Sequence, residues 1–353
     1  MKKKVIIISL IFIFFMLISF IGVFMYNISP VNKKSDKLIS FTIKSGTSKN
    51  LIISNLKKEN LIRSEFFSKV IVKFRNKELY AGTYKLSKDL STIEIIEKLE
   101  NQENVENENI TITFVEGKRL KTYVKQISEE FNFTEDEINA KLSDETFLKS
   151  LTNKYWFIGD EIFNKDIYNP LEGYFFPDTY QFKKNSTIED VIYRFLDTMS
   201  LKLNDYKEDI ELSKYKIHDL LTLASIVELE GVNSKDRAMV AGVFYNRLNL
   251  GMSLGSDVTT YYAVNKDFTN DLSQSDLDSC NGYNTRGNCV SGLPVGPICS
   301  PSLSSIAASI NPTENDYLYF VADKDKNTYF SKDNDEHIRT VSKLKNEGKW
   351  YTY

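Results

Sequence analysis

The pattern of hydrophobic positions separates one long apolar run from a much longer part with mixed patterning. The run extends from Val5 to Tyr26 and is interrupted only by Ser9, Ser19 and Gly22. As a helix with a rise of about 1.5 Å per residue it would be roughly 33 Å long, enough to cross a hydrocarbon core of about 30 Å. No Ala-x-Ala cleavage pattern follows. We therefore expect an uncleaved transmembrane anchor, with a long cleaved signal peptide as the alternative.

The charges next to this run predict its orientation. Lys2, Lys3 and Lys4 precede it, and basic residues at the end of an anchor favour the cytoplasmic side. We therefore expect residues 1–4 in the cytoplasm, a transmembrane segment over 5–26 and everything after about residue 30 outside. The polar segment 27–37 contains a proline and is expected to be a linker.

The patterning after the linker predicts two domains and an α+β fold. Over residues 38–105 it predicts a strand, a Gly turn, two helices, a second strand and a helix capped at Ser91 or Thr92. The acidic, Asn-rich stretch 100–109 has almost nothing to bury and is expected to connect this domain to the next. Residues 110–353 are expected to form a larger, mixed α/β domain.

Within the larger domain the pattern predicts a strand over ITITFVEG and a hairpin from YLYFVAD and NTYFS. The dense aromatic segment NPLEGYFFPDTYQF is expected to be a cleft wall or a buried junction. The expected helices cover residues 121–131 and 187–204, an apolar segment that carries Glu228, a segment that ends in VFYNRL, and residues 335–346. The loop after VFYNRL is polar and carries Asp257 and Thr259.

Composition narrows the classes of function. The net charge is −3, so no basic surplus points to a nucleic-acid partner. The two histidines, His218 and His337, are far apart in sequence, so we expect neither a His-rich metal site nor a cofactor. Cys280 and Cys289 could form a disulfide that closes a loop, with Cys299 as a free thiol, or all three could be free thiols.

Glu228 is the first candidate for a general acid. It lies on a predicted apolar helix, and a carboxyl group in apolar surroundings has a raised pKa and can hold a proton near neutrality. Glu230 lies two positions on, about 200° around the helix, so only one of the two can face a given cleft. The alternative is a structural carboxylate paired with Arg237 or Arg247.

Two polar segments downstream offer weaker candidates. Asp257 and Thr259 can bind a ligand or cap a turn, and Asp257 could be the second carboxylate of a hydrolase. Tyr283 and Asn284 offer an aromatic face and an amide, which suit a sugar and equally suit an ordinary loop.

Several separated motifs carry a resemblance to a known family. The segment LASIVELEG followed by VAGVFYNRLNLGMSLGSD resembles the pattern of the MltG-type (YceG-like) endolytic murein transglycosylases. NPLEGYFFPDTYQF, GYNT, SGLPVGPICSPS and DYLYFVAD resemble further segments of that family in the same order. The resemblance covers residues 38 to about 345.

The resemblance implies a single-pass enzyme of the bacterial cell membrane, with a LysM-like domain over 38–105 and a catalytic domain over 110–353. Such an enzyme cleaves the bond between N-acetylmuramic acid and N-acetylglucosamine without water, because the muramic acid's own 6-hydroxyl attacks and forms a 1,6-anhydro ring. One glutamate, Glu228 on its helix, would act first as acid and then as base. Glycan strands and membrane-bound peptidoglycan synthases are the implied partners. The candidate substrate-binding residues are Ser225, Asn246, Asp257, Thr259, Tyr283 and Asn284.

The chain departs from the family pattern at several positions. Gly255 and Val258 replace a glutamine and a proline, Arg286 replaces a tyrosine, and Val115 stands where a proline is usual. NTYF replaces the usual Gly-His-x-Phe. A muramidase-type hydrolase and a non-catalytic glycan-binding scaffold of the cell-wall machinery therefore remain as alternatives.

Overall fold

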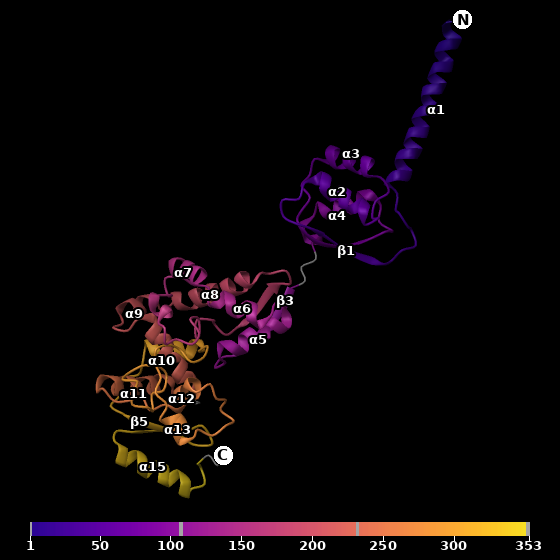
Figure 1. The fold of residues 1–353 in the computed structure, drawn as a ribbon. Coiled ribbons are helices and arrows are strands. Elements are labelled where there is room, and N and C mark those ends of the chain that lie inside the picture. Colours follow the sequence, from indigo (N-terminus) through magenta and orange to yellow (C-terminus); the bar gives the residue numbers. More distant parts are fainter. Residues whose placement is uncertain (1, 106–108, 231–232, 351–353) are drawn as a thin grey trace. The chain divides into compact units, whose positions relative to one another are not determined.

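The computed structural model describes residues 2–105, 109–230 and 233–350, with side chains from Leu10 onward. It shows a mixed α+β protein that is mostly helical, with three small antiparallel sheets in the described residues (Figure 1). The chain divides into two compact units, residues 1–108 and 109–353.

The first unit begins with the apolar helix that the sequence predicted. Helix α1 (Lys2–Ile28) is continuous, and its stretch Leu10–Ile28 is long and apolar enough to cross a membrane. From Leu10 onward, most of its apolar side chains are exposed. Its last turn is different, because Ile28 is buried in the core of the first unit and Phe24 packs against that core.

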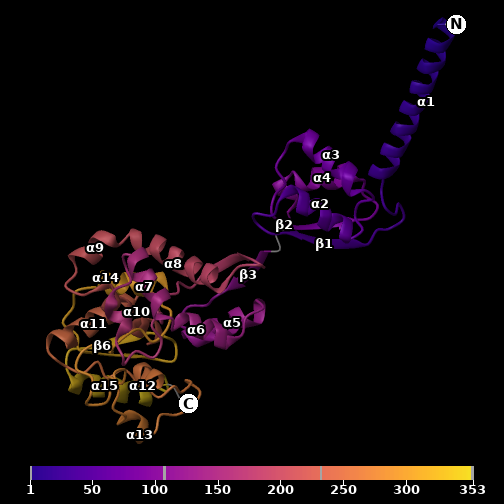
Figure 2. The same cartoon turned by 45° about the horizontal axis from the view of Figure 1, so that its top comes forward.

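The rest of the first unit is two strands covered by helices. Strand β1 (Leu38–Ile43) pairs antiparallel with β2 (Gly82–Ser87), so that Leu38 lies opposite Ser87. Figures 1 and 2 place the strands on the side of the unit opposite α3. The predicted cap at Ser91 is confirmed, since Ser91 and Glu94 form a reciprocal capping box. The helices are α2 (Lys49–Lys58), α3 (Glu65–Arg75), α4 (Thr92–Leu99) and the short η1 (Gln102–Asn104).

One hydrophobic core of the second unit contains a two-stranded sheet, and the sequence predicted only one of its strands. Strand β3 (Asn109–Thr113) was predicted, but its antiparallel partner β4 (Thr179–Lys183) was not. β4 ends the aromatic segment, whose Tyr174, Phe175 and Phe176 are buried in the core. The helices of this half are α5 (Leu120–Glu130), α6 (Glu135–Leu142), α7 (Glu145–Lys154), η2 (Asp160–Phe163), α8 (Ile188–Asn204) and α9 (Lys207–Leu212).

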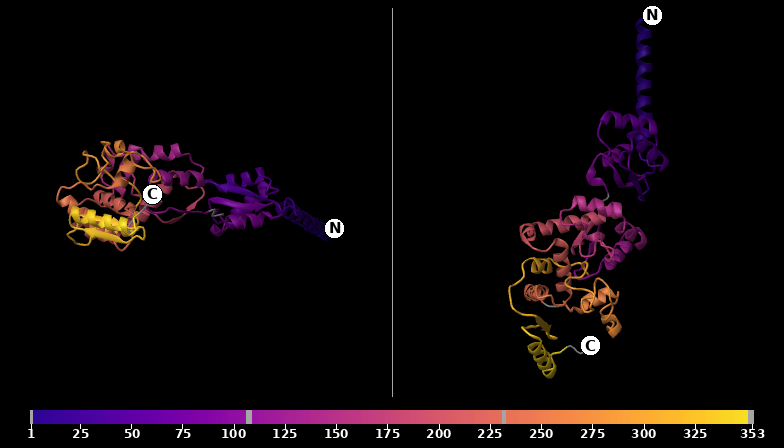
Figure 3. Two further views of the ribbon diagram at one scale, coloured as in Figure 1. Left: turned by 90° about the horizontal axis from the view of Figure 1, so that it is seen from below. Right: turned by 60° about the vertical axis from the view of Figure 1, so that its left-hand side comes forward.

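Helix α10 (Ile217–Leu229) joins this core to a second one. Leu221 and Ala224 belong to the first core, whereas Leu223 and Ile226 belong to the second. A helix that is apolar on all sides is buried on all sides, and α10 packs against α11 (Arg237–Asn249) and α14 (Leu303–Ile310). The predicted hairpin of β5 (Tyr319–Ala322) and β6 (Thr328–Ser331) is confirmed. It packs with α15 (Asn334–Asn346) (Figure 3).

The prediction that Asp257 and Thr259 lie in a polar loop is wrong. Both residues lie on α12 (Asp257–Ala263), which precedes the single-turn α13 (Gln274–Leu277). A helix of seven residues makes only about two turns, which is too short to show helical periodicity in a sequence. Ser256 precedes α12 in an extended conformation, but its hydroxyl makes no capping hydrogen bond.

The disulfide between Cys280 and Cys289 forms, and Cys299 is a buried free thiol. The bridge closes the loop that carries Tyr283, Asn284 and Arg286. A covalent link of this kind removes conformational freedom from the unfolded chain.

We predict that replacing Cys280 and Cys289 together by serine lowers the free energy of unfolding by about 2.5 kcal/mol, the loop-closure term for a nine-residue separation. Denaturant titration of the full chain in detergent measures it. A reductant should destabilise the wild type by a similar amount and leave the double variant unchanged. Equal stability of wild type and variant would contradict the bridge's role.

Candidate functional site

Glu228 lies in the last turn of α10, and its side chain is only 5% exposed. Its Oε2 accepts three hydrogen bonds from the start of α14. The donors are the backbone N–H of Ser302 at 2.9 Å, the Ser302 hydroxyl at 2.5 Å and the Ser305 hydroxyl at 2.7 Å. Ser302 is also the N-cap of α14. The carboxylate therefore faces the positive end of a helix dipole.

The remaining donor to Glu228 is a guanidinium group. Arg237, the first residue of α11, donates from Nη2 to Oε1 of Glu228 at 3.1 Å. Its Nη1 donates to the Ser302 hydroxyl at 2.6 Å and also to Ser304. Its Nε is buried and has no hydrogen-bond partner among the described residues. The guanidinium thus ties the glutamate to α14 while one of its own donors stays unused.

These contacts differ from the apolar surroundings that the sequence suggested. The α10 residues before Glu228 are buried as expected, for example Ser225, Ile226 and Val227. The carboxylate itself, however, contacts hydroxyl, amide and guanidinium donors from α14 and α11. Hydrogen bonds from such donors stabilise a negatively charged carboxylate. The pairing with Arg237, which the sequence left open as an alternative, is present in the structure.

Glu230 points to other partners, as the helical geometry predicted. Its Oε1 accepts a 2.5 Å hydrogen bond from Ser256, just before α12. Burial raises the pKa of this carboxyl group, and the negative charge of Asp257 adds to the effect, while the Ser256 hydroxyl opposes it. The two glutamates therefore occupy different environments only two residues apart.

Three of the other predicted site residues lie in the helix and loop near Glu230, where their side chains are buried and contact other residues of the same region. Thr259 is fully buried and hydrogen-bonds the hydroxyl of Thr285 at 2.8 Å. Asn284 is also buried, accepting from Thr260 at 2.7 Å and donating to backbone carbonyls. The ring of Tyr283 is buried against Tyr262. In this conformation these side chains hold the loop together.

The other three candidates are placed differently. Ser225 is buried and accepts from the backbone N–H of Ile298, which fixes the segment that leads to Ser302. Asn246 donates to backbone carbonyls of residues 315 and 317. The side chain of Asp257 is half exposed and forms an ion pair with Arg286, one of the family departures. Among the six candidates, Asp257 is the one whose side chain is open to solvent.

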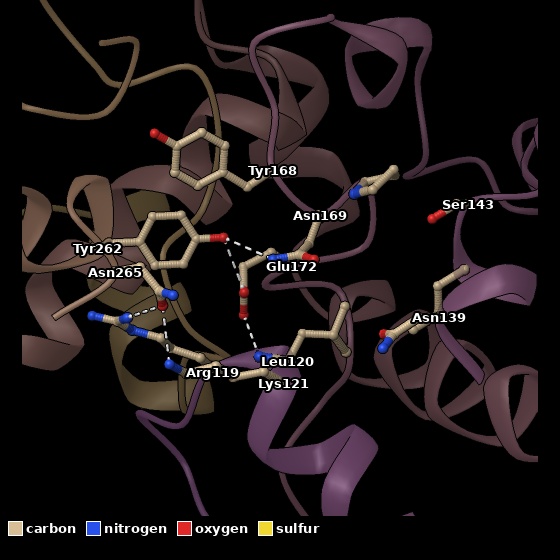
Figure 4. Close-up of a pocket in the computed structure, with 12 residues that line it drawn as sticks. Arg119, Leu120, Lys121, Asn139, Ser143, Tyr168, Asn169, Glu172, Tyr262 and Asn265 are labelled. Carbon is tan, nitrogen blue, oxygen red and sulfur yellow. Dashed lines mark hydrogen bonds between the residues drawn. The ribbon is translucent and has the colours of Figure 1, made fainter. Parts of the chain in front are cut away.

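A cavity of about 430 Å³ contains an acidic residue that the sequence reasoning passed over. Figure 4 shows Glu172 between the backbone N–H of Leu120 and the hydroxyl of Tyr262, which donate to it at 2.7 and 3.1 Å. Arg119 and Lys121 lie nearby, both within hydrogen-bonding reach of Asn265. The signal in the sequence was an acidic residue placed just before the aromatic run of the segment NPLEGYFFPDTYQF.

Burial raises the pKa of Glu172 to about 7, even though its two hydrogen bonds and the charges of Arg119 and Lys121 act in the opposite direction. The side chain is almost completely buried. Its carboxyl group fixes the start of α5, and the backbone N–H of nearby Gly117 donates to the carbonyl of Ser300, two residues before Ser302. Glu172 therefore supports one side of the structure around Glu228.

The fold and the site together define a class: an α+β protein with an N-terminal apolar helix and one glutamate held by hydroxyl and guanidinium donors at the end of a buried helix. The chain belongs to the YceG-like family, whose model matches residues 41–343. It is 36% identical to an endolytic murein transglycosylase of Bacillus subtilis over 91% of this chain and 90% of the relative.

Two further comparisons agree with this family. An endolytic murein transglycosylase of Streptococcus pneumoniae is 34% identical over 94% of this chain, which spans 63% of that longer relative. The crystal structure of a yceG-like protein from Listeria monocytogenes matches 86% of this chain and 99% of its own, with a TM-score of 0.61 and 31% identity. The named relatives are lytic transglycosylases, and this is the enzyme class to which family membership assigns the chain.

We predict that Glu172→Gln changes how stability depends on pH. The folded pKa of about 7 lies above the ordinary value of 4.5, so the folded state keeps a proton that the unfolded state loses between these two values. Wild-type stability should therefore fall across this window, by up to about 3 kcal/mol, whereas glutamine does not titrate. Denaturant titrations at pH 5 and pH 8 give the free energy of unfolding of each protein. The value for the variant minus that for the wild type should be larger at pH 8 than at pH 5. A constant difference would contradict the raised pKa.

Proposed function

We propose that the chain is a membrane-anchored endolytic murein transglycosylase that cleaves the β-1,4 bond between N-acetylmuramic acid and N-acetylglucosamine and leaves 1,6-anhydro ends. One observation carries this proposal: Glu228, the first of the two glutamates in the family-like LASIVELEG segment, is held at the end of α10 by four donated hydrogen bonds. Such a group can give and then take back one proton.

The reaction needs one carboxyl group and no water. Protonated Glu228 gives its proton to the leaving oxygen as the bond from the muramic acid C1 breaks. The 6-hydroxyl of the same sugar then forms the new C1–O6 bond, and Glu228 takes the hydroxyl proton. Because the nucleophile belongs to the substrate, its effective concentration is high. The glutamate therefore ends the cycle protonated, as it began, and the proton that it first held is on the leaving oxygen.

The observed contacts correspond to the second half of this cycle. Donors from Ser302, Ser305 and Arg237 suit an ionised Glu228 that is ready to act as a base. For the first half the carboxyl group must hold a proton, which requires it to give up at least one donor. Arg237 is the donor best placed to leave, because it is the sole partner of Oε1 in the described structure.

The surrounding carboxylates support the lyase over a muramidase-type hydrolase. A hydrolase needs a second carboxylate as nucleophile or to activate water. Glu230 is directed to Ser256, and Asp257 is paired with Arg286. Neither contacts Glu228 or its hydroxyl partners in the described structure. The intact site around Glu228 likewise favours an enzyme over a non-catalytic scaffold.

We further propose that residues 38–105 form a LysM-like domain, residues 110–353 the catalytic domain, and α1 an uncleaved anchor. Burial of Ile28 in the core of the first unit supports an anchor that is kept. Lysines lie at both ends of the apolar run Val5–Tyr26, at positions 2–4 and at 33, 34 and 37, so we infer the orientation of α1 in the membrane from the location of the substrate. Glycan strands lie outside the bilayer, which places the N-terminus inside and membrane-bound peptidoglycan synthases among the neighbours.

We predict that Glu228→Gln lowers cleavage of uncrosslinked glycan strands by at least about 10²-fold, because a neutral amide can act neither as acid nor as base. Binding of glycan by pull-down should persist, since the amide keeps the shape of the side chain. Mass analysis of the products of the full chain measures both the rate and the type of end.

Asp257→Asn is the matched control for this experiment, because it removes the rival carboxylate. It should retain 1,6-anhydro products at a rate within a few-fold of the wild type. Reducing ends in the wild-type digest, together with an inactive Asp257→Asn variant, would instead identify a hydrolase. An inactive wild type that still binds glycan would support the scaffold.

We predict that Ser302→Gly lowers the rate of anhydro-product formation by about tenfold, because it removes a 2.5 Å hydroxyl donor that holds Glu228 in place and leaves only the backbone N–H of residue 302. Glycine costs only a few tenths of a kcal/mol as an N-cap, so the fold should persist. Initial rates with equal amounts of folded wild type and variant give the ratio. A variant as active as the wild type would mean that the hydroxyl does not position Glu228.

A further inference from the structure

Helix α3 presents an unusual exposed face. Phe66 is 69% exposed and Phe74 is 85% exposed. Lys69, Val70 and Lys73 lie between them at positions i+3, i+4 and i+7 from Phe66, so all five residues form one stripe along the helix. The opposite side of α3 is buried in the core of the first unit. Large aromatic side chains on such an open face indicate contact with an apolar partner.

The stripe is continuous with the end of the membrane helix. The ring of Phe24 in α1 lies 5.5 Å from the ring of Phe67, which lies 5.4 Å from that of Phe66. Arg63, just before α3, stacks over Tyr26 with its guanidinium 4.9 Å from the ring centre. The same guanidinium donates to the carbonyls of Pro30 and Val31 at 2.9 and 3.0 Å. These contacts join the start of α3 to the last turns of α1.

The length of the apolar run sets the depth of this junction. A hydrocarbon core of about 30 Å uses nearly all of the roughly 33 Å between Val5 and Tyr26. Phe24 and Tyr26 therefore lie at the edge of the hydrocarbon. Side chains that contact them, such as Phe67, lie at the same level, where amphipathic helices bind bilayers.

The charges next to the stripe fit an anionic surface. A groove of about 580 Å³ between α2 and α3 is lined by Lys49, Lys69 and Lys73 together with Phe66. Lys69 also pairs with Glu65, and Lys49 pairs with Glu78. Across residues 27–76 there are eleven Lys or Arg and three Asp or Glu, although the whole chain has a net charge of −3. The basic charge is therefore concentrated beside the anchor.

We propose that the stripe of α3 formed by Phe66, Lys69, Val70, Lys73 and Phe74 lies in the membrane interface and binds anionic lipid headgroups through its lysines. This inference rests on the proposed anchoring by α1. The aromatic rings enter the boundary between headgroups and chains, while the lysine ammonium groups contact phosphates. The first unit then has two attachments to the bilayer, so it cannot swing about the end of α1.

Tryptophan quenching by brominated lipids in vesicles tests this proposal with the full reconstituted chain. Phe74→Trp reports on the stripe, Phe20→Trp reports on the anchor, and Leu38→Trp is an exposed control on β1. The signal of the native Trp156 and Trp350 is subtracted with the wild type. The vesicles contain phosphatidylcholine alone or equal parts of phosphatidylcholine and phosphatidylglycerol.

The expected result is quenching at position 74 about twofold or more above that at position 38, and stronger quenching at 74 with phosphatidylglycerol present. Adding Lys69→Glu and Lys73→Glu to Phe74→Trp should remove the dependence on phosphatidylglycerol. Strong quenching at position 20 with equal, weak quenching at 74 and 38 would overturn the α3 proposal and leave the anchor standing. Weak quenching at position 20 would overturn the anchor, and the α3 proposal with it.

Discussion

The second unit depends on the burial of α10, in which every residue from Leu220 to Val227 is buried. Because this helix belongs to two hydrophobic cores at once, its position and rotation are fixed from every side. Its last turn is where the burial ends, and Glu228 lies there. A charged group at such a position requires partners, and the N-terminus of α14 and the guanidinium of Arg237 supply them. The same packing that stabilises the domain therefore also orients the proposed catalytic group.

The sequence predicted the local geometry of this site but not its chemistry. The divergence of Glu228 and Glu230 follows from two positions on one helix, so it could be derived without a structure. The hydroxyl donors Ser302 and Ser305 are 74 and 77 residues away from Glu228. No local pattern specifies such contacts. The pairing of β3 with β4 escaped prediction for the same reason, since the strands are separated by α5, α6 and α7.

The polar residues downstream of α11 show how a polar pattern can mislead. Thr259, Tyr283 and Asn284 have the side chains of a sugar site, yet the structure uses them to join α12 to the disulfide-closed loop. A buried loop must satisfy its backbone groups, and nearby hydroxyls and amides do this. The family resemblance placed these segments in the right order along the chain, but it could not separate residues that hold the loop from residues that contact a ligand.

A single carboxylate that serves as both acid and base meets opposing electrostatic demands. Donors that favour the ionised form help it to accept a proton and make it harder to protonate for the first step. Oε2 accepts all three hydrogen bonds from the start of α14, whereas Oε1 has the Arg237 guanidinium as its one partner in the described structure. The two oxygens of one carboxylate therefore divide these demands. Oε2 keeps the group in place, and Oε1, whose partner is a single side chain, is the oxygen that the proposed reaction can use.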